Sequence, residues 1–133
     1  MKNPFIIRIF FIFLISNICQ AEVLKLTVGK DHYLLESKDD ENIVLEKGCW
    51  EKKSSCEAYS ALEKISWSNY KPKEVKNGGK NPSSMFCREA HHGMIAIAKD
   101  EKGNSYSLCI LKDRSVTTAD TLVYASKKLK VKK

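Results

Sequence analysis

The chain has 133 residues, and its 23 basic against 16 acidic residues give it a net charge of +7. This length provides for one small domain or two closely packed halves and argues against two independent cores. The basic balance favours anionic surroundings, such as the cell envelope or lipid head groups, and says nothing about the fold.

The first 21 residues have the pattern of an export signal. Lys2 and Arg8 supply a positive start, residues 9–15 are an almost unbroken apolar run, and Ala21 closes a short cleavage motif. The run is shorter than the about 20 apolar residues that cross a bilayer, so we expect cleavage after Ala21 rather than an anchor. The mature chain would have 112 residues, a net charge of +5 and a periplasmic or secreted location.

Four cysteines remain after this cleavage: Cys49, Cys56, Cys87 and Cys109. An even number in an exported chain predicts two disulfide bonds. Zinc is the weaker alternative, because zinc ligands usually include cysteines two to four residues apart. Four cysteines allow three pairings, which the sequence does not distinguish. We favour Cys49 with Cys56 and Cys87 with Cys109, bonds that contribute about 2.5 and about 3.4 kcal/mol in the chain-entropy model.

Residues 22–70 are expected to begin with a small antiparallel meander. Apolar and polar residues alternate over 23–28, which is the period of a half-buried strand. Gly29 lies in the turn that follows, and a second strand is predicted over 32–36. After a charged loop, the apolar run 43–45 predicts a third strand.

A helix is predicted after this meander. Ser54 and Glu57 stand three residues apart and match a capping box, in which each side chain accepts a hydrogen bond from the backbone of the other. The helix is therefore expected to begin at Ser54 and to end near Trp67. Its buried stripe is predicted to consist of Ala58, Leu62 and Ile65.

Residues 71–80 are expected to link two halves of the chain, because they contain a proline, a glycine pair and four lysines with almost nothing apolar. The second half, residues 81–126, is predicted to begin with a helix. Asn81 suits its N-cap and Pro82 its first helical position. Gly93 is placed where a left-handed C-cap glycine would end it.

A hairpin and a last helix complete the second half. Residues 94–98 and 105–111 have the composition and length of strands, and a turn rich in charge and glycine separates them. Cys109 lies on the returning strand. Thr117 and Asp120 resemble a capping box and predict the start of the last helix. The expected fold is α+β: a small antiparallel sheet or hairpins with two to three short helices, stapled by disulfides.

The second half resembles a known family over about residues 78–125. The run GGKNPSSMFC ending at Cys87, then Gly93, Cys109 and the turn KDRS at 112–115 follow its pattern of an Asn-Pro helix start, two cysteines and a polar turn. The pattern is that of the domain-of-unknown-function 333 family, short exported bacterial proteins and lipoproteins that often carry a hemolysin label. The resemblance implies a Cys87–Cys109 bond and no specific activity.

The chain departs from the pattern of this family at two positions of the second half, and it also lacks the Trp-containing segment that the family has downstream. Arg114 stands where the family has a turn glycine, and His92 stands where a glycine pair is usual. Family members are often lipid-anchored, but Ile18 precedes Cys19 here, whereas lipidation needs a small residue at that place. We therefore expect an unanchored protein.

The sequence shows no catalytic constellation. His91 and His92 are adjacent, and adjacent helical side chains point about 100° apart, so the two rings are poorly placed to bind one metal ion, even if His32 were a further ligand. Near a helix C-terminus they instead suit the negative end of the helix dipole. A Cys49 nucleophile is disfavoured because an exported cysteine with a partner is normally oxidised. The serines at predicted helix starts are expected to cap backbone amides: Ser54, Ser83 and Ser84. We therefore predict a non-enzymatic protein without a metal or cofactor.

Trp50 and the basic tail are the candidate surface-binding residues. Most aromatic residues of so small a domain are expected to pack in its core, and Trp50 beside Cys49 is the one proposed for binding. We expect the tail over 127–133 to be a frayed, solvated terminus. Docking onto acidic lipid, at about 1 kcal/mol per lysine, is the alternative. The lysines of this tail are Lys127, Lys128, Lys130, Lys132 and Lys133.

The resulting hypothesis is an exported, non-enzymatic protein that acts as a binding or envelope-associated module. Its expected partners are an unidentified protein, an envelope component or an anionic membrane surface, and no nucleic acid. The alternative is a membrane-active, hemolysin-like factor that acts on anionic lipid. The sequence predicts neither the specific partner nor the oligomeric state.

Overall fold

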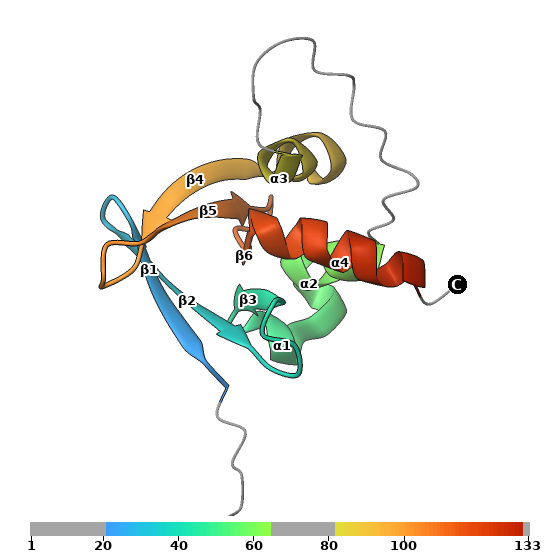
Figure 1. Cartoon of the computed structure of the whole chain (residues 1–133), viewed down its shortest axis with the longest axis horizontal. Coiled ribbons are helices and arrows are strands. Elements are labelled where there is room, and N and C mark those ends of the chain that lie inside the picture. Colours follow the sequence, from blue (N-terminus) through green and yellow to red (C-terminus); the bar gives the residue numbers. More distant parts are fainter. Residues whose placement is uncertain (1–20, 65–81, 132–133) are drawn as a thin grey trace, which may run out of the picture.

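The computed structural model describes residues 21–64 and 82–131. The predicted linker over 71–80, and all of the predicted leader before Ala21, lie outside the described residues. Within them, six antiparallel strands form a closed barrel in the order β1-β2-β3-β6-β5-β4, and the helices gather at one side (Figure 1). The α+β class and the disulfides are confirmed. The sheet, however, is a closed barrel rather than a set of hairpins.

The predicted meander forms half of this barrel. It consists of β1 (Val23–Val28), β2 (Asp31–Ser37) and β3 (Val44–Glu46). β1 pairs with β2 along its full length, and β3 pairs with the end of β2. Gly29 turns the first hairpin at φ 59°, a left-handed conformation that glycine adopts without a Cβ penalty.

Two short helices follow where one was predicted. They are α1 (Cys49–Lys52) and α2 (Glu57–Lys64), with a 3-10 turn (Lys53–Ser55) between them. A disulfide joins Cys49 to Cys56 and ties the start of α1 to the residue before α2. The expected helix start at Ser54 is wrong, because that serine lies in the 3-10 turn.

The N-terminus of α2 is capped from a distant loop instead of by Ser54. The backbone N–H of Glu57 donates to Oδ2 of Asp113 at 2.8 Å, and that of Ala58 donates to Oγ of Ser115 at 2.9 Å. These side chains satisfy helix donors that otherwise lack intrahelical partners. The capping box therefore marks the right helix but the wrong capping residue.

The second half begins with α3 (Pro82–Met85), a π-helical turn (Phe86–Ala90) and the predicted hairpin of β4 (Met94–Lys99) and β5 (Ser105–Ile110). The two strands pair from end to end. Asp100 holds the hairpin turn, because its carboxylate accepts hydrogen bonds from the backbone of the turn and from the side chains that flank it. The predicted hairpin is confirmed.

Gly93 has a different role from the predicted C-cap. The left-handed residue after the helix is His92, at φ 53°. A Cβ added at Gly93 would lie 2.7 Å from Sγ of Cys109 and 2.8 Å from Sγ of Cys87, which are bonded to each other. Glycine is required here because the disulfide lies against the backbone.

β6 (Val116–Thr118) joins the two halves and was not predicted. It pairs with β5 and, through Leu45 and Thr117, with β3. The hydroxyl of Thr117 also donates to the carbonyl oxygen of Val44 at 2.7 Å. The two halves thus share one sheet rather than two.

The last helix, α4 (Ala119–Val131), begins one residue later than a cap at Thr117 predicts. Thr118 caps it, since its Oγ1 accepts a hydrogen bond from the backbone N–H of Thr121 at 3.2 Å. Thr117, the expected capping residue, lies in β6. The helix continues to Val131 and so includes most of the tail that was expected to be frayed. The expectation of a frayed terminus is therefore wrong for residues 127–131.

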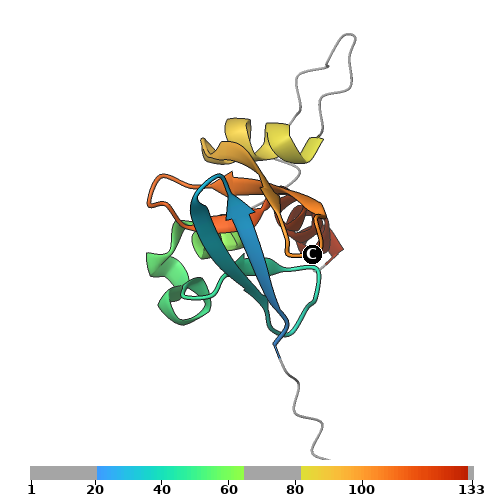
Figure 2. The same cartoon turned by 90° about the vertical axis from the view of Figure 1, so that its left-hand side faces the viewer.

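Two clusters of buried side chains hold the molecule together. One lies inside the barrel, behind the β1–β2 hairpin that faces the viewer in Figure 2. The other lies between the barrel wall and the helices and contains both disulfides. The first cluster consists of Leu26, Leu35, Ala98, Leu108 and Val116, and the second includes Leu45, Phe86 and Leu122.

Candidate binding site at the barrel mouth

One end of the barrel opens into a hollow of about 750 Å³, which we call the barrel mouth. It is lined by the β1–β2 turn, the start of β4, the end of β5 and the loop after β5. Its lining residues are Val28, Asp31, His32, Tyr33, His92, Met94, Ala96, Ile110, Leu111, Lys112 and Arg114.

The floor of the barrel mouth is apolar because of strand alternation. Residues two apart in a strand share a face, so Ala96 and Met94 lie on the same face of β4 as buried Ala98. Tyr33 and Val28 continue the inner faces of β2 and β1 in the same way. Met94 is 67% exposed, which leaves a large apolar side chain in contact with solvent at this opening.

The mouth coincides with a weak seam in the barrel. β1 and β4 pair through a single residue pair, Thr27 with Lys99, whereas the β4–β5 ladder runs the whole length of both strands. Beyond that pair, the β1–β2 turn and the first residues of β4 no longer form a ladder. The hollow opens at this point.

Charged and titratable side chains form the rim. Lys112 and Arg114 come from the loop after β5, Asp31 and His32 from the β1–β2 turn, and His92 precedes β4. His32 contacts Thr27, with 3.1 Å between its Nδ1 and the threonine Oγ1. Across the two described ranges, neither Lys112 nor Arg114 forms an ion pair with a carboxylate.

Two rim residues have a left-handed backbone. Besides Lys53, the non-glycine residues with positive φ in the described chain are His92, at 53°, and Arg114, at 68°. Such conformations cost about 1–3 kcal/mol for residues with a Cβ and concentrate at functional sites. Two of the three such residues in the described chain thus lie at the rim, and one of them, His92, directly follows the end of a helical turn.

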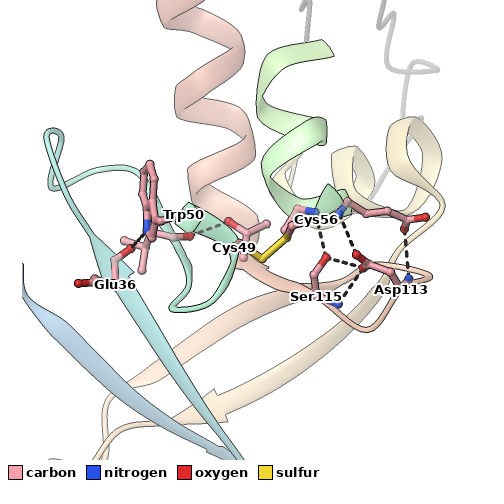
Figure 3. The surroundings of a disulfide bond; sticks show 10 residues. Glu36, Cys49, Trp50, Cys56, Asp113 and Ser115 are labelled. Carbon is pink, nitrogen blue, oxygen red and sulfur yellow. Dashed lines mark hydrogen bonds between the residues drawn. A yellow bond between two sulfur atoms is a disulfide. The ribbon is translucent and has the colours of Figure 1, made fainter. Parts of the chain in front are cut away.

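Trp50, predicted to bind at the surface, anchors α1 to the barrel. Its indole N–H donates to the carbonyl oxygen of Glu36 in β2 at 2.7 Å (Figure 3). Its ring packs edge-on against Tyr59, with 6.2 Å between centroids, and the ammonium of Lys38 lies 5.9 Å from the ring centre. This half-buried tryptophan is already engaged and lies outside the barrel mouth.

The lysine tail is partly engaged as well. Lys127 and Lys128 lie in α4, and Nζ of Lys128 is 2.6 Å from Oδ2 of Asp40, which also accepts a hydrogen bond from the hydroxyl of Tyr124. The bond from Lys128 holds the pKa of Asp40 well below its usual range, and the pKa of Lys128 is raised. The Lys130 side chain, and Lys132 and Lys133 altogether, lie outside the described residues.

The adjacent histidines point to different parts of the molecule. His91 packs against Phe86, with ring centroids 5.6 Å apart, and its Nε2 is buried without a hydrogen-bond partner. Burial, followed by the charge of His92, lowers the pKa of His91. His92 instead lines the barrel mouth together with His32. Within the described ranges no group of three or more metal-ligating residues occurs.

A second hollow of about 360 Å³ lies beside the Cys49–Cys56 bond. Two of its lining residues, Asp113 and Ser115, serve the α2 cap, and the carboxylate of Asp113 accepts hydrogen bonds from both the backbone N–H and the hydroxyl of Ser115 (Figure 3). Arg114 lines this hollow as well as the barrel mouth. Burial acts to raise the pKa of Asp113, but hydrogen bonds to the carboxylate outweigh it and lower the pKa. We assign this hollow a structural role.

Comparison with family models, curated proteins and solved structures finds no match for this chain. The resemblance to the domain-of-unknown-function 333 family therefore stays a prediction. No helix in residues 21–64 or 82–131 combines the length and apolar character needed to cross a bilayer. The barrel mouth was missed because its residues come from separate segments, although Arg114 in place of a turn glycine was one available signal.

Proposed function

We propose that this chain is an exported, non-enzymatic binding protein whose ligand site is the barrel mouth. The observation that supports it is a hollow of about 750 Å³ with an apolar floor and a polar rim. Small-molecule sites typically have about 300–1,000 Å³ and this division of apolar and polar groups, and mouths of β-barrels are a common location.

The export part of the proposal rests on the predicted leader and on the disulfides. The structure joins Cys49 to Cys56 and Cys87 to Cys109, and such bonds persist in oxidising compartments. They are compatible with a periplasmic or secreted protein. Mass spectrometry of the natural protein, with and without reductant, tests cleavage after Ala21 and both bonds.

Binding at the mouth is tested with the neutral fluorophore N-phenyl-1-naphthylamine, whose emission rises in apolar surroundings. We expect saturable binding to the oxidised mature chain. Ala96→Phe places a ring inside the mouth and should weaken binding at least about tenfold. Ile97→Phe is the matched control, because residue 97 is the next residue of β4, faces outward and is 59% exposed.

The matched pair separates blocking of the mouth from general damage to the strand. Circular dichroism and thermal unfolding establish that both variants are folded. Weaker binding in Ala96→Phe alone supports the proposal. If the folded wild-type protein gives no saturable signal, or if both variants bind as the wild type does, the mouth is not the site.

A membrane-active factor is the second candidate, supported by the exposed side chain of Lys127, which forms no ion pair within the described chain. Dye release from anionic vesicles tests it. Neutralising Lys127, Lys130, Lys132 and Lys133 with glutamine leaves the Lys128–Asp40 pair and the helix length intact. Release that these substitutions abolish supports this candidate, and no release at micromolar protein eliminates it.

A further inference from the structure

The rim of the barrel mouth carries an excess of positive charge. Lys112 and Arg114 line it from the same loop, and Asp31 is the acidic residue of the lining. The guanidinium of Arg114 stays protonated at any physiological pH. Since neither cation is neutralised by a carboxylate of the described chain, both remain available to a ligand.

The loop that carries these cations is held in place. The backbone N–H of Arg114 donates to the carbonyl oxygen of Leu111, and that of Leu111 donates to the carbonyl oxygen of Ser115, both at 2.9 Å. Asp113 and Ser115 are fixed in turn by their bonds to the start of α2. A cation on a loop that is already ordered loses less conformational entropy on binding an anion.

The apolar floor lies next to this cationic rim. Ala96, Tyr33 and Ile110 line the hollow together, and Met94 exposes 67% of its surface at the opening. A ligand that fills the mouth thus meets apolar side chains along its body and cations at one end. From this juxtaposition we infer that the barrel mouth takes a small organic anion with an apolar body and a carboxylate or sulfonate head.

This inference rests on the proposed function and adds the ligand class to it. Two probes test the ligand class separately from the binding site. One is N-phenyl-1-naphthylamine, which is neutral, and the other is 8-anilinonaphthalene-1-sulfonate, which is the same ring system with a sulfonate. We expect the folded, oxidised mature chain to bind the sulfonate about tenfold more tightly than the neutral probe at low salt, since charge-assisted hydrogen bonds add to the apolar contacts.

Arg114→Gly is the decisive variant. It removes the charge while residue 114 keeps a backbone conformation, φ 68°, that glycine adopts without strain. We expect it to weaken sulfonate binding about tenfold and to leave binding of the neutral probe unchanged. Lys102→Gln is the matched control, because this exposed lysine lies in the turn at the opposite end of the β4–β5 hairpin.

The outcomes distinguish the ligand class from the site. Sulfonate binding that is saturable, displaced by decanoate and weakened by Arg114→Gly but not by Lys102→Gln supports the inference. If both probes bind equally, or if Arg114→Gly has no effect, the anion preference is wrong while the mouth remains a site. If neither probe binds, the proposed function fails together with the inference.

Discussion

Substitution of Gly93 by alanine should destabilise the protein by about 2 kcal/mol or more. The added methyl carbon would lie 2.7 and 2.8 Å from the sulfurs of the Cys87–Cys109 bond and 3.1 Å from the carbonyl oxygen of Ile110. Extra atoms in a packed core cost about 1–3 kcal/mol. Urea unfolding of the oxidised protein measures the loss.

Gly48→Ala is the control for Gly93→Ala. A Cβ at residue 48 meets nothing within 4 Å, and its φ is −70°, so the free energy of unfolding should change by less than about 1 kcal/mol. If crowding by the disulfide is the cause, Gly93→Ala should also cost less when Cys87 and Cys109 are alanine. Equal losses in both backgrounds would contradict this explanation.

At the scale of the element, the start of α2 depends on a loop 57 residues away in the chain. Ser115→Ala removes the acceptor of the Ala58 N–H, which is fully buried, and should cost about 1–2 kcal/mol. Ser54→Ala should change the free energy of unfolding by less than about 0.5 kcal/mol, since Ser54 is exposed and its hydroxyl makes no hydrogen bond within the described chain. Denaturant unfolding of both variants compares the two capping assignments. A larger loss of unfolding free energy in Ser54→Ala than in Ser115→Ala would favour Ser54 as the capping residue.

The elements that the sequence predicted well are those that local patterns determine. The β1–β2 hairpin follows from the alternating residues of 23–28 and the β4–β5 hairpin from apolar segments of strand length, each around a turn that contains glycine, Gly29 or Gly103. α2 was recognised from its apolar spacing, but its capping residues were not, because Asp113 and Ser115 are distant in sequence. Short-range periodicity carries no information about which distant loop packs against a helix end.

Features that depend on pairing between the two halves could not be predicted from the sequence. β6 has three residues, too few to show a period, and its pairing with β3 and β5 closes the barrel. The barrel mouth combines residues from the β1–β2 turn, β4, β5 and the following loop, so no motif marks it. Trp50 and Lys128 were predicted to be available for binding because the sequence does not show that they contact Glu36 and Asp40, which lie elsewhere in the chain.

At the scale of the molecule, the shared barrel makes the two halves one structural unit. Each disulfide lies within one half, Cys49–Cys56 in the first and Cys87–Cys109 in the second. The halves are connected by β3–β6 and β1–β4 pairing and by the buried cluster that contains both bonds. Stability lost in one half should therefore be lost throughout.

The double substitution Cys49→Ala and Cys56→Ala tests this coupling. The chain-entropy model gives a loss of about 2.5 kcal/mol for this bond. Amide hydrogen exchange should then accelerate by the same factor, about 70-fold, for the slowest amides of β2 in the first half and of β5 in the second, because both exchange through global unfolding. Acceleration confined to the first half would show that the second half keeps its structure alone, and the barrel would then join two separately stable parts.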